Sequence, residues 1–287
     1  MAYYEKFMLK KIFVAVVKDF RFYRLAHYEL MIVLGIVLAK NNFPVIFSAK
    51  ILLSYVLLAA SLYLACLFSL ITNNIADIDI DKISNKKRPL ITGAVDIATY
   101  KKLGKASLFL TFLFAFSSGV LNGLIICLFL FNYYIYSAPP LRLKRITFLS
   151  KLCISINSFI LVLSGYLLAC GTANQFPLSI ILYLLIFFTA AINFIDIKDY
   201  EGDLKAGIKT LPVVLGLKNS KRLIGVFYFI AYLATYLLLK QIWLLLILIP
   251  TGAVQYILIN KENYQEKNIF RLYILSLLGL ILFLLIY

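Results

Sequence analysis

The sequence predicts an all-α, polytopic membrane protein with about nine transmembrane helices in a bundle around a central cavity. Hydrophobic residues make up 63% of the 287-residue chain, and the mean hydropathy is +0.93. Apolar runs of about 20 residues, the length needed to cross a bilayer as a helix, recur from residue 25 to the C-terminus. Basic residues are concentrated between these runs, as in the loops of membrane proteins.

Nine apolar runs are candidate spans, and together we expect them to form one transmembrane domain over residues 1–287. Short polar breaks at residues 122–123 and 171–174 predict tight turns between neighbouring helices. The long apolar stretch 222–259 is divided at Lys240. The predicted spans lie near residues 25–40, 50–73, 104–119, 122–138, 150–170, 177–195, 222–240, 241–259 and 270–287.

The distribution of lysine and arginine predicts the orientation. With nine spans, 26 of the 29 basic residues fall on one side of the membrane, and only Lys40, Lys50 and Lys240 fall on the other. The positive-inside rule then places the N-terminus and the basic loops in the cytoplasm, which suggests the cell membrane of a prokaryote. The net charge of +16 indicates attraction to anionic membrane lipids rather than to nucleic acid, because the basic residues are spread over many loops.

The first 18 residues have two interpretations. They could form a basic interfacial helix, with apolar side chains such as Ile12, Phe13, Val16 and Val17 facing lipid. They could equally be a flexible tail.

Acidic residues gather in two short segments, 73–81 and 196–203, which hold seven of the 13 acids in the chain. A carboxylate at the centre of a membrane helix costs about 2.5–3.5 kcal/mol, so this grouping suggests a function. In the first segment, Asn73, Asp77 and Asp81 are four residues apart and would share one helix face. Amide and carboxylate oxygens suit Mg²⁺, and the basic loop that follows, including Arg88, would suit a phosphate.

The second segment repeats this pattern, with Asp199 and Asp203 four residues apart and Asp196 one turn earlier. A third segment, residues 136–145, reads Tyr-Ser-Ala-Pro-Pro-Leu-Arg-Leu-Lys-Arg and ends the fourth span. In an extended backbone, alternate side chains point in the same direction, so the side chains of Arg142 and Lys144 could point the same way.

The chain resembles the UbiA family of intramembrane prenyltransferases. The family's first motif, Asn-Asp-x-x-Asp-x-x-x-Asp, matches residues 73–81, except that Asn74 stands where the family usually has aspartate. Its second motif, Asp-x-x-x-Asp, matches Asp199 and Asp203, and the segment 136–144 is similar to a loop of several members. The order of the motifs and the nine-helix topology extend this resemblance over essentially the whole chain.

The resemblance implies Mg²⁺-dependent transfer of a prenyl group from a prenyl diphosphate to an aromatic or lipid-type acceptor, in lipid or quinone biosynthesis. Two Mg²⁺ ions would bridge the diphosphate as it leaves. Tyr136 is a candidate for stabilising the allylic cation, and Asp196 for orienting or deprotonating the acceptor. The implied metal ligands are Asn73, Asp77, Asp81, Asp199 and Asp203, with Asp77 and Asp199 also central to catalysis, and the implied diphosphate ligands are Arg88, Arg142, Lys144 and Arg24.

Two questions stay open at the level of sequence. A cation-coupled transporter or channel is the alternative function, although it would favour acids within the spans rather than at their ends. For the acceptor, the Asp-Tyr-Glu-Gly-Asp run of residues 199–203 resembles archaeal digeranylgeranylglyceryl phosphate synthases, whose acceptor is a glycerol phosphate. The Pro139-Pro140 loop instead resembles the branch of the family that acts on aromatic acceptors.

Overall fold

A computed structural model of the chain describes residues 12, 14–20, 22–42 and 48–286. The regular secondary structure in this part of the chain is all helical, and one isolated β-bridge joins Ile146 and Lys209. The chain divides into two compact units. Unit 1 comprises residues 1–26 and 47–142, and unit 2 comprises residues 27–46 and 143–287.

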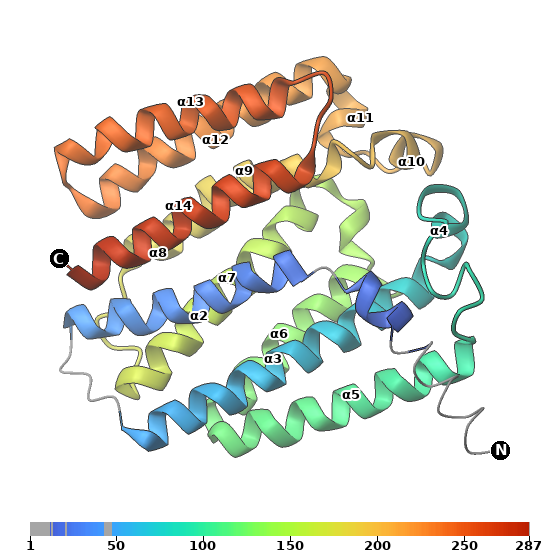
Figure 1. The fold of residues 1–287 in the computed structure, drawn as a ribbon, viewed down its shortest axis with the longest axis horizontal. Coiled ribbons are helices and arrows are strands. Elements are labelled where there is room, and N and C mark those ends of the chain that lie inside the picture. Colours follow the sequence, from blue (N-terminus) through green and yellow to red (C-terminus); the bar gives the residue numbers. More distant parts are fainter. Residues whose placement is uncertain (1–11, 13, 21, 43–47, 287) are drawn as a thin grey trace. The chain divides into compact units, whose positions relative to one another are not determined.

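Unit 1 is built around three long helices. Helix α3 packs along α5, and α6 packs against both of them (Figure 1). The side chain of Asp96 caps α5 by accepting a hydrogen bond of 2.9 Å from the Thr99 amide. The helices of unit 1 are α3 (Ala49–Ala76), α4 (Ile78–Ser84), α5 (Ile97–Ser118) and α6 (Val120–Ser137).

The turn between α5 and α6 lies three residues earlier than the sequence predicted. The chain turns at Gly119, whose φ of 141° is a conformation that glycine adopts readily. Asn122 and Gly123, where we expected the turn, lie inside α6 and are buried. A side chain at residue 123 would overlap the Phe116 ring, since an added Cβ would lie 2.4 Å from its Cδ1 atom. Gly123 therefore allows close helix packing rather than a turn.

Unit 2 contains most of α2 and the second half of the chain. The membrane-length segment Leu178–Asp196 of this unit is irregular, because a π-helical turn (Tyr183–Phe188) and a 3₁₀ turn (Ile192–Asp196) interrupt it. The regular helices of unit 2 are α2 (Phe22–Asn42), α7 (Thr147–Cys170), α8 (Leu178–Leu182), α9 (Thr189–Ala191), α10 (Tyr200–Lys205), α11 (Leu211–Leu215), α12 (Leu217–Leu239), α13 (Leu245–Asn260) and α14 (Glu266–Ile286).

Two glycines let α2 and α7 approach closely. A Cβ atom added to Gly35 would lie 1.9 Å from the Val162 carbonyl oxygen, and one added to Gly165 would lie 1.9 Å from that of Ile32. Small residues at helix contacts are common in membrane proteins for this reason. The predicted turns at Gly171 and Lys240 are confirmed, and both residues end their helices in the left-handed conformation.

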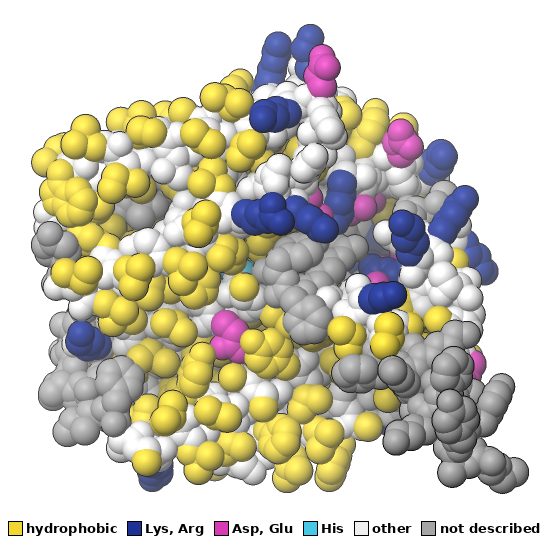
Figure 2. All heavy atoms as spheres, viewed as in Figure 1, with side chains coloured by type: hydrophobic (Ala, Val, Ile, Leu, Met, Phe, Trp, Pro, Cys, Tyr) yellow, Lys and Arg dark blue, Asp and Glu magenta, His cyan; other side chains and the backbone are white. Residues whose placement is uncertain are grey.

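The described residues form helices over all nine predicted spans, and seven of these helical segments are long and apolar enough to cross a membrane. Helix α5 is not among the seven, because Lys101, Lys102 and Lys105 fall in its first half. Apolar side chains cover the outward faces of the long helices, while lysine and arginine gather around α4 in unit 1 and around α10 and α11 in unit 2 (Figure 2). This surface is that of a protein surrounded by lipid.

The segment before α2 packs onto unit 1. Val16 is 8% exposed and contributes to a core with Ile71, Val95 and Tyr100, so the expectation that Val16 faces lipid is wrong. Ile12 packs against the same core. Phe13 and residues 1–11 lie outside the described residues, so the interfacial-helix interpretation of residues 1–18 stays a prediction for them.

Candidate active site

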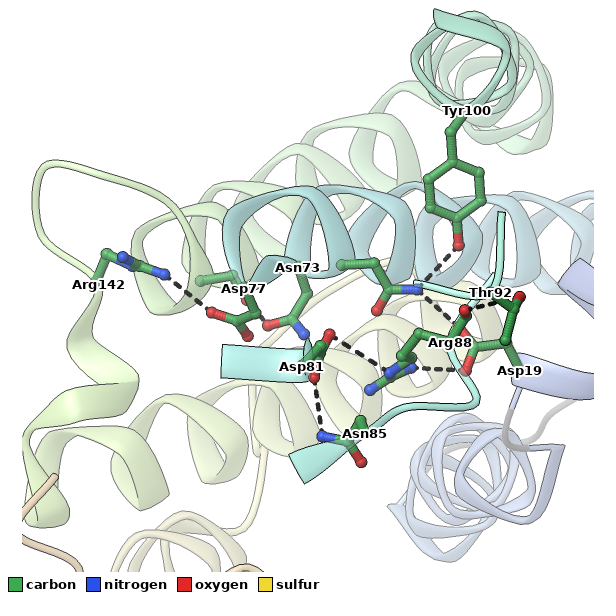
Figure 3. Close-up of polar contacts among 11 residues, drawn as sticks. Asp19, Asn73, Asp77, Asp81, Asn85, Arg88, Thr92, Tyr100 and Arg142 are labelled. Atoms are coloured by element: carbon green, nitrogen blue, oxygen red, sulfur yellow. Dashed lines mark hydrogen bonds and ion pairs between the residues drawn. The ribbon is translucent and has the colours of Figure 1, made fainter. Parts of the chain in front are cut away.

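The first acidic segment follows α3 into α4. Helix α3 ends at Ala76, and Asp77 links it to the short helix α4. Hydrogen bonds of helical spacing continue across the link, since the Asp77 amide donates to the Asn73 carbonyl at 2.9 Å and the Asp81 amide to the Asp77 carbonyl at 2.8 Å. The side chains of Asn73, Asp77 and Asp81 consequently lie next to one another (Figure 3). The sequence predicted their shared face, although it did not predict the break at Asp77.

Two of the predicted diphosphate ligands lie at this segment. Arg142 Nη2 donates to Asp77 Oδ1 at 2.9 Å and to the Ala76 carbonyl at 2.7 Å, and its Nε is buried without a hydrogen-bond partner. Arg88 Nε lies 3.7 Å from Asp81 Oδ2. Each carboxylate therefore has its own arginine beside it (Figure 3).

Three further polar residues complete the site in unit 1, and the sequence did not single them out. Asp19 accepts a hydrogen bond of 2.8 Å from Arg88 Nη1. Asn85 donates to Asp81 Oδ1 at 2.8 Å, and Ser137 donates to Asn73 Oδ1 at 3.2 Å. The spacing of Asn85 from Asp81, four residues along a helix, is a signal that could have been used. Asp19 lies 69 residues from Arg88, and no local pattern reveals that pair.

The second acidic segment lies in unit 2. Asp196 ends the 3₁₀ turn, Asp199 directly precedes α10 and Asp203 lies within that helix. Lys151, from α7, donates to Asp196 Oδ1 at 2.6 Å, and its side chain is only 3% exposed. The other carboxylate oxygen of Asp196 is buried and has no hydrogen-bond partner. Lys151 was counted from the sequence as one of many basic loop residues, but it is the buried partner of a predicted catalytic acid.

The three acids of this segment influence one another. Burial raises the pKa of Asp203 from its ordinary 3.8 to about 7, and the negative charges of Asp196 and Asp199 add to this effect. A cluster of like charges that disfavours ionisation in this way would be relieved by a bound cation. The electrostatics of the segment thus fit the metal site predicted for Asp199 and Asp203.

We expect Asp203→Asn to stabilise the protein when no Mg²⁺ is present. Because the pKa of Asp203 is raised on folding, the wild-type free energy of unfolding should fall as the pH rises from about 4 to about 7. The free energy of unfolding of the variant should not fall in this way. The variant should therefore be about 1 kcal/mol more stable than wild type at pH 8 and equally stable at pH 4. The difference at pH 8 is small because solvent screens the part-exposed side chain. Thermal unfolding in detergent with EDTA measures the difference.

The matched control is Glu201→Gln, which removes an exposed acid from the same helix. Its melting temperature should match that of wild type at both pH values. Equal stabilisation by the two substitutions would attribute the effect to net charge alone.

The remaining predicted site residues lie as follows. Tyr136 precedes Ser137 on α6. Its ring lies edge-on to the ring of Tyr133, with 5.8 Å between the ring centroids. Lys144 lies on the 3₁₀ turn Leu143–Arg145, in unit 2. Arg24 lies in α2, and its side chain is outside the described part of the structure.

The carboxylate oxygens of the two acidic segments suit Mg²⁺ that is bound by the protein and by a substrate at the same time, rather than Mg²⁺ bound by protein side chains alone. Within the described residues, no three His, Cys, Asp or Glu side chains converge tightly enough to hold a metal by themselves. Mg²⁺ is usually bound through one or two carboxylates, with substrate phosphates and waters as its other ligands. Asp77 with Asp81, and Asp199 with Asp203, each offer such a pair of carboxylates, so the residues present fit the predicted ion.

Comparison with known proteins identifies the family. Residues 30–285 match the profile of the UbiA prenyltransferase family. Homogentisate phytyltransferase from Synechocystis sp. is 33% identical over 175 residues, which cover 56% of this chain and 56% of that enzyme. Digeranylgeranylglyceryl phosphate synthase from Thermococcus gammatolerans is 27% identical over 213 residues, which cover 72% of this chain and 71% of that enzyme. The chain thus spans little more than half the length of the first of these relatives.

The fold agrees with this result. The structure of a UbiA homolog from Archaeoglobus fulgidus bound to GPP and Mg²⁺ superposes with a TM-score of 0.72 at 20% identity, covering 95% of this chain and 100% of that one. The predicted all-helical, multi-pass membrane architecture is confirmed. Among the described residues, seven helical segments are long and apolar enough to cross a membrane, and helices occupy all nine predicted places. The chain belongs to the UbiA prenyltransferase family.

Proposed function

We propose that the protein transfers a prenyl group from a prenyl diphosphate to an aromatic or glycerol-phosphate-type acceptor and releases diphosphate, with Mg²⁺ bound at each acidic segment. The observation that carries this proposal is the arrangement in unit 1. There two carboxylates and an amide lie together, with Arg88 and Arg142 beside the carboxylates. Such a site provides oxygens for a divalent cation and guanidinium groups for a phosphate.

In this proposal Arg142 exchanges its partner when the donor binds. Arg142 leaves Asp77 for an oxygen of the diphosphate, and its buried Nε gains an acceptor that it otherwise lacks. Arg88 and Lys144 bind further oxygens, and Arg24 is a further candidate. Bound Mg²⁺ would offset the charge on the departing diphosphate. Asn73, Asp77 and Asp81 are the ligands proposed in unit 1, and Asp199 and Asp203 those in unit 2.

The transfer itself exchanges one bond for another. The bond between C1 of the prenyl group and the diphosphate oxygen breaks, with its electrons leaving on oxygen, and a new bond forms between C1 and the acceptor. The half-buried Tyr136 is proposed to stabilise the allylic cation through its ring face. Lys151 binds Oδ1 of Asp196 and so fixes the carboxylate. Asp196 is proposed to take the acceptor proton on its other oxygen, Oδ2.

Mass spectrometry of products tests the function. Purified protein would be incubated with Mg²⁺, geranyl or geranylgeranyl diphosphate, and separate acceptors of the two classes, such as homogentisate and a glycerol phosphate prenyl ether. A prenylated product with one acceptor class, formed only with Mg²⁺, is the expected result. Ion flux across vesicles without consumption of prenyl diphosphate would instead favour a transporter.

We also propose that the N-terminus and both acidic segments face the cytoplasm. The charge asymmetry of the loops supports this orientation.

Lys87 and Lys240 are both exposed, and the nine-span topology places them on opposite sides of the membrane. In a background with Cys66, Cys127, Cys153 and Cys170 replaced by alanine, an impermeant maleimide should label Lys240→Cys in intact cells. Lys87→Cys should be labelled only after the cells are permeabilised, and the reverse pattern would contradict the orientation.

A further inference from the structure

Asn74 lies at the centre of a buried network in unit 1. Its side chain is 1% exposed, and its amide nitrogen donates to Asp19 Oδ2 at 2.7 Å and to the Tyr100 hydroxyl at 2.9 Å. The other oxygen of Asp19 accepts the hydrogen bond of 2.8 Å from Arg88 Nη1. One carboxylate thus lies between an amide donor and a guanidinium donor.

The network constrains Arg88 on the side away from Asp81. Asp19 binds Nη1 of the guanidinium, while Nε lies 3.7 Å from Asp81 Oδ2 (Figure 3). The Arg88 side chain is 10% exposed and that of Asp19 is 12% exposed, so the ion pair is shielded from water and strongly oriented. Any change that moves the Asp19 carboxylate will therefore also move the guanidinium.

The amide of Asn74 is chemically necessary in this arrangement. Asparagine can donate to the Asp19 carboxylate, whereas an ionised aspartate can only accept. An aspartate at residue 74 would bring a second carboxylate to within hydrogen-bond distance of Asp19, in a site too buried for water to screen the repulsion. The single guanidinium of Arg88 would then face three negative charges, those of Asp19, Asp81 and the introduced carboxylate.

We propose that Asn74 is a positioning residue, which holds Asp19 so that Asp19 fixes Arg88 for the diphosphate of the donor. The inference rests on the proposed function and adds to it a role for two residues outside the metal ligands. It also explains the departure from the usual motif, because in this chain Asp19 supplies the carboxylate and residue 74 must supply the donor. Aspartate, the residue usual at this position in the family, should be harmful here.

The test is a set of four proteins: wild type, Asn74→Asp, Asp19→Asn and the double variant with both substitutions. Asn74→Asp should raise KM for geranyl diphosphate about tenfold, the size of a coupling between contacting charged groups, while kcat changes much less. In the double variant, asparagine at residue 19 can again donate to a carboxylate at residue 74. We expect it to recover most of the lost affinity, which a purely additive effect would not do.

Two controls separate positioning from folding. Asp79→Asn removes an exposed acid of α4 that pairs with Lys82 rather than Arg88, and it should leave KM unchanged. Tyr100→Phe keeps the ring that packs in the core but removes the hydroxyl that accepts from Asn74. This variant should raise KM about threefold with little change in melting temperature, and it decides the question if Asn74→Asp does not fold.

The outcomes are distinct. A wild-type KM in Asn74→Asp, or in Tyr100→Phe when the former does not fold, would overturn the proposal. A double variant no better than the single variants would do the same. Failure of the wild type to consume either geranyl or geranylgeranyl diphosphate with acceptors of both classes would instead overturn the proposed function. Raised KM values with recovery in the double variant would establish the positioning role.

Discussion

Replacing either Asp77 or Asp199 by asparagine should lower Mg²⁺-dependent prenyl transfer on the order of 10³-fold. Each substitution removes one negative charge from a proposed metal ligand but keeps its shape, so the chain should still insert and fold. In unit 1 the Asp77→Asn variant also loses the ion pair with Arg142, which lies 2.9 Å from the carboxylate. The rate of diphosphate release at saturating Mg²⁺ and geranyl diphosphate measures the effect.

The matched controls for this experiment are Asp79→Asn and Glu201→Gln. Both residues lie in the same acidic segments but are not among the proposed Mg²⁺ ligands, and both are exposed. They should keep the wild-type rate. Wild-type turnover in Asp77→Asn or Asp199→Asn would refute the metal assignment for that segment.

The second large effect is expected at Lys151. Asp196 is only 8% exposed, and Lys151→Met would leave its buried carboxylate without a cation. Removing one partner of a buried ion pair costs about 3–5 kcal/mol. The apparent melting temperature in detergent should fall by about 10 °C or more. Activity should be lost as well, because Asp196 would no longer be held in position.

A double variant distinguishes these two consequences. Lys151→Met combined with Asp196→Leu removes both charges, and replacing a buried ion pair by apolar residues is often neutral for stability. We expect the melting temperature to recover while activity does not. Lys82→Met, which breaks an exposed pair with Asp79, should change stability by less than about 0.5 kcal/mol. Recovery of activity in the double variant would show that Asp196 has no catalytic role.

The fold could be predicted from the sequence because the membrane makes helices obligatory and sets their length. All nine predicted spans correspond to helical segments, and the breaks at Gly171 and Lys240 are in the predicted places. The turn before α6 was misplaced because Asn122-Gly123 reads as a turn signal, whereas Gly119 has the required positive φ. The π-helical turn at Tyr183–Phe188 has no signature in a uniformly apolar run.

The candidate site was predictable where its residues follow helical spacing. Asn73, Asp77 and Asp81 lie together because hydrogen bonds of helical spacing continue through the junction of α3 and α4. Asp19 and Lys151 could not be found in this way, since their partners lie 69 and 45 residues away in sequence. Both are single charged residues in basic segments, and only the packing of helices pairs them with the predicted arginine and aspartate.

Residue 74 illustrates the same limit. The sequence shows a departure from the family motif at Asn74. Its effect would be small if the side chain points away from the metal site, and would change donor affinity or metal preference if it points toward it. The structure instead shows that the Asn74 side chain donates to Asp19 and Tyr100. The consequence of the substitution depends on a residue in a different segment, which a motif does not include.

Titration of Mg²⁺ with a slowly reacting donor analogue, geranyl S-thiolodiphosphate, tests the central claim most directly. Calorimetry with the purified wild-type protein should detect tight binding of the analogue only when Mg²⁺ is present, with about two ions bound per chain. Asp77→Asn and Asp199→Asn should each weaken this binding and lower the number of ions. Binding of the analogue that is equally tight in EDTA, or unchanged in both variants, would contradict the claim that the two acidic segments hold Mg²⁺ for a diphosphate.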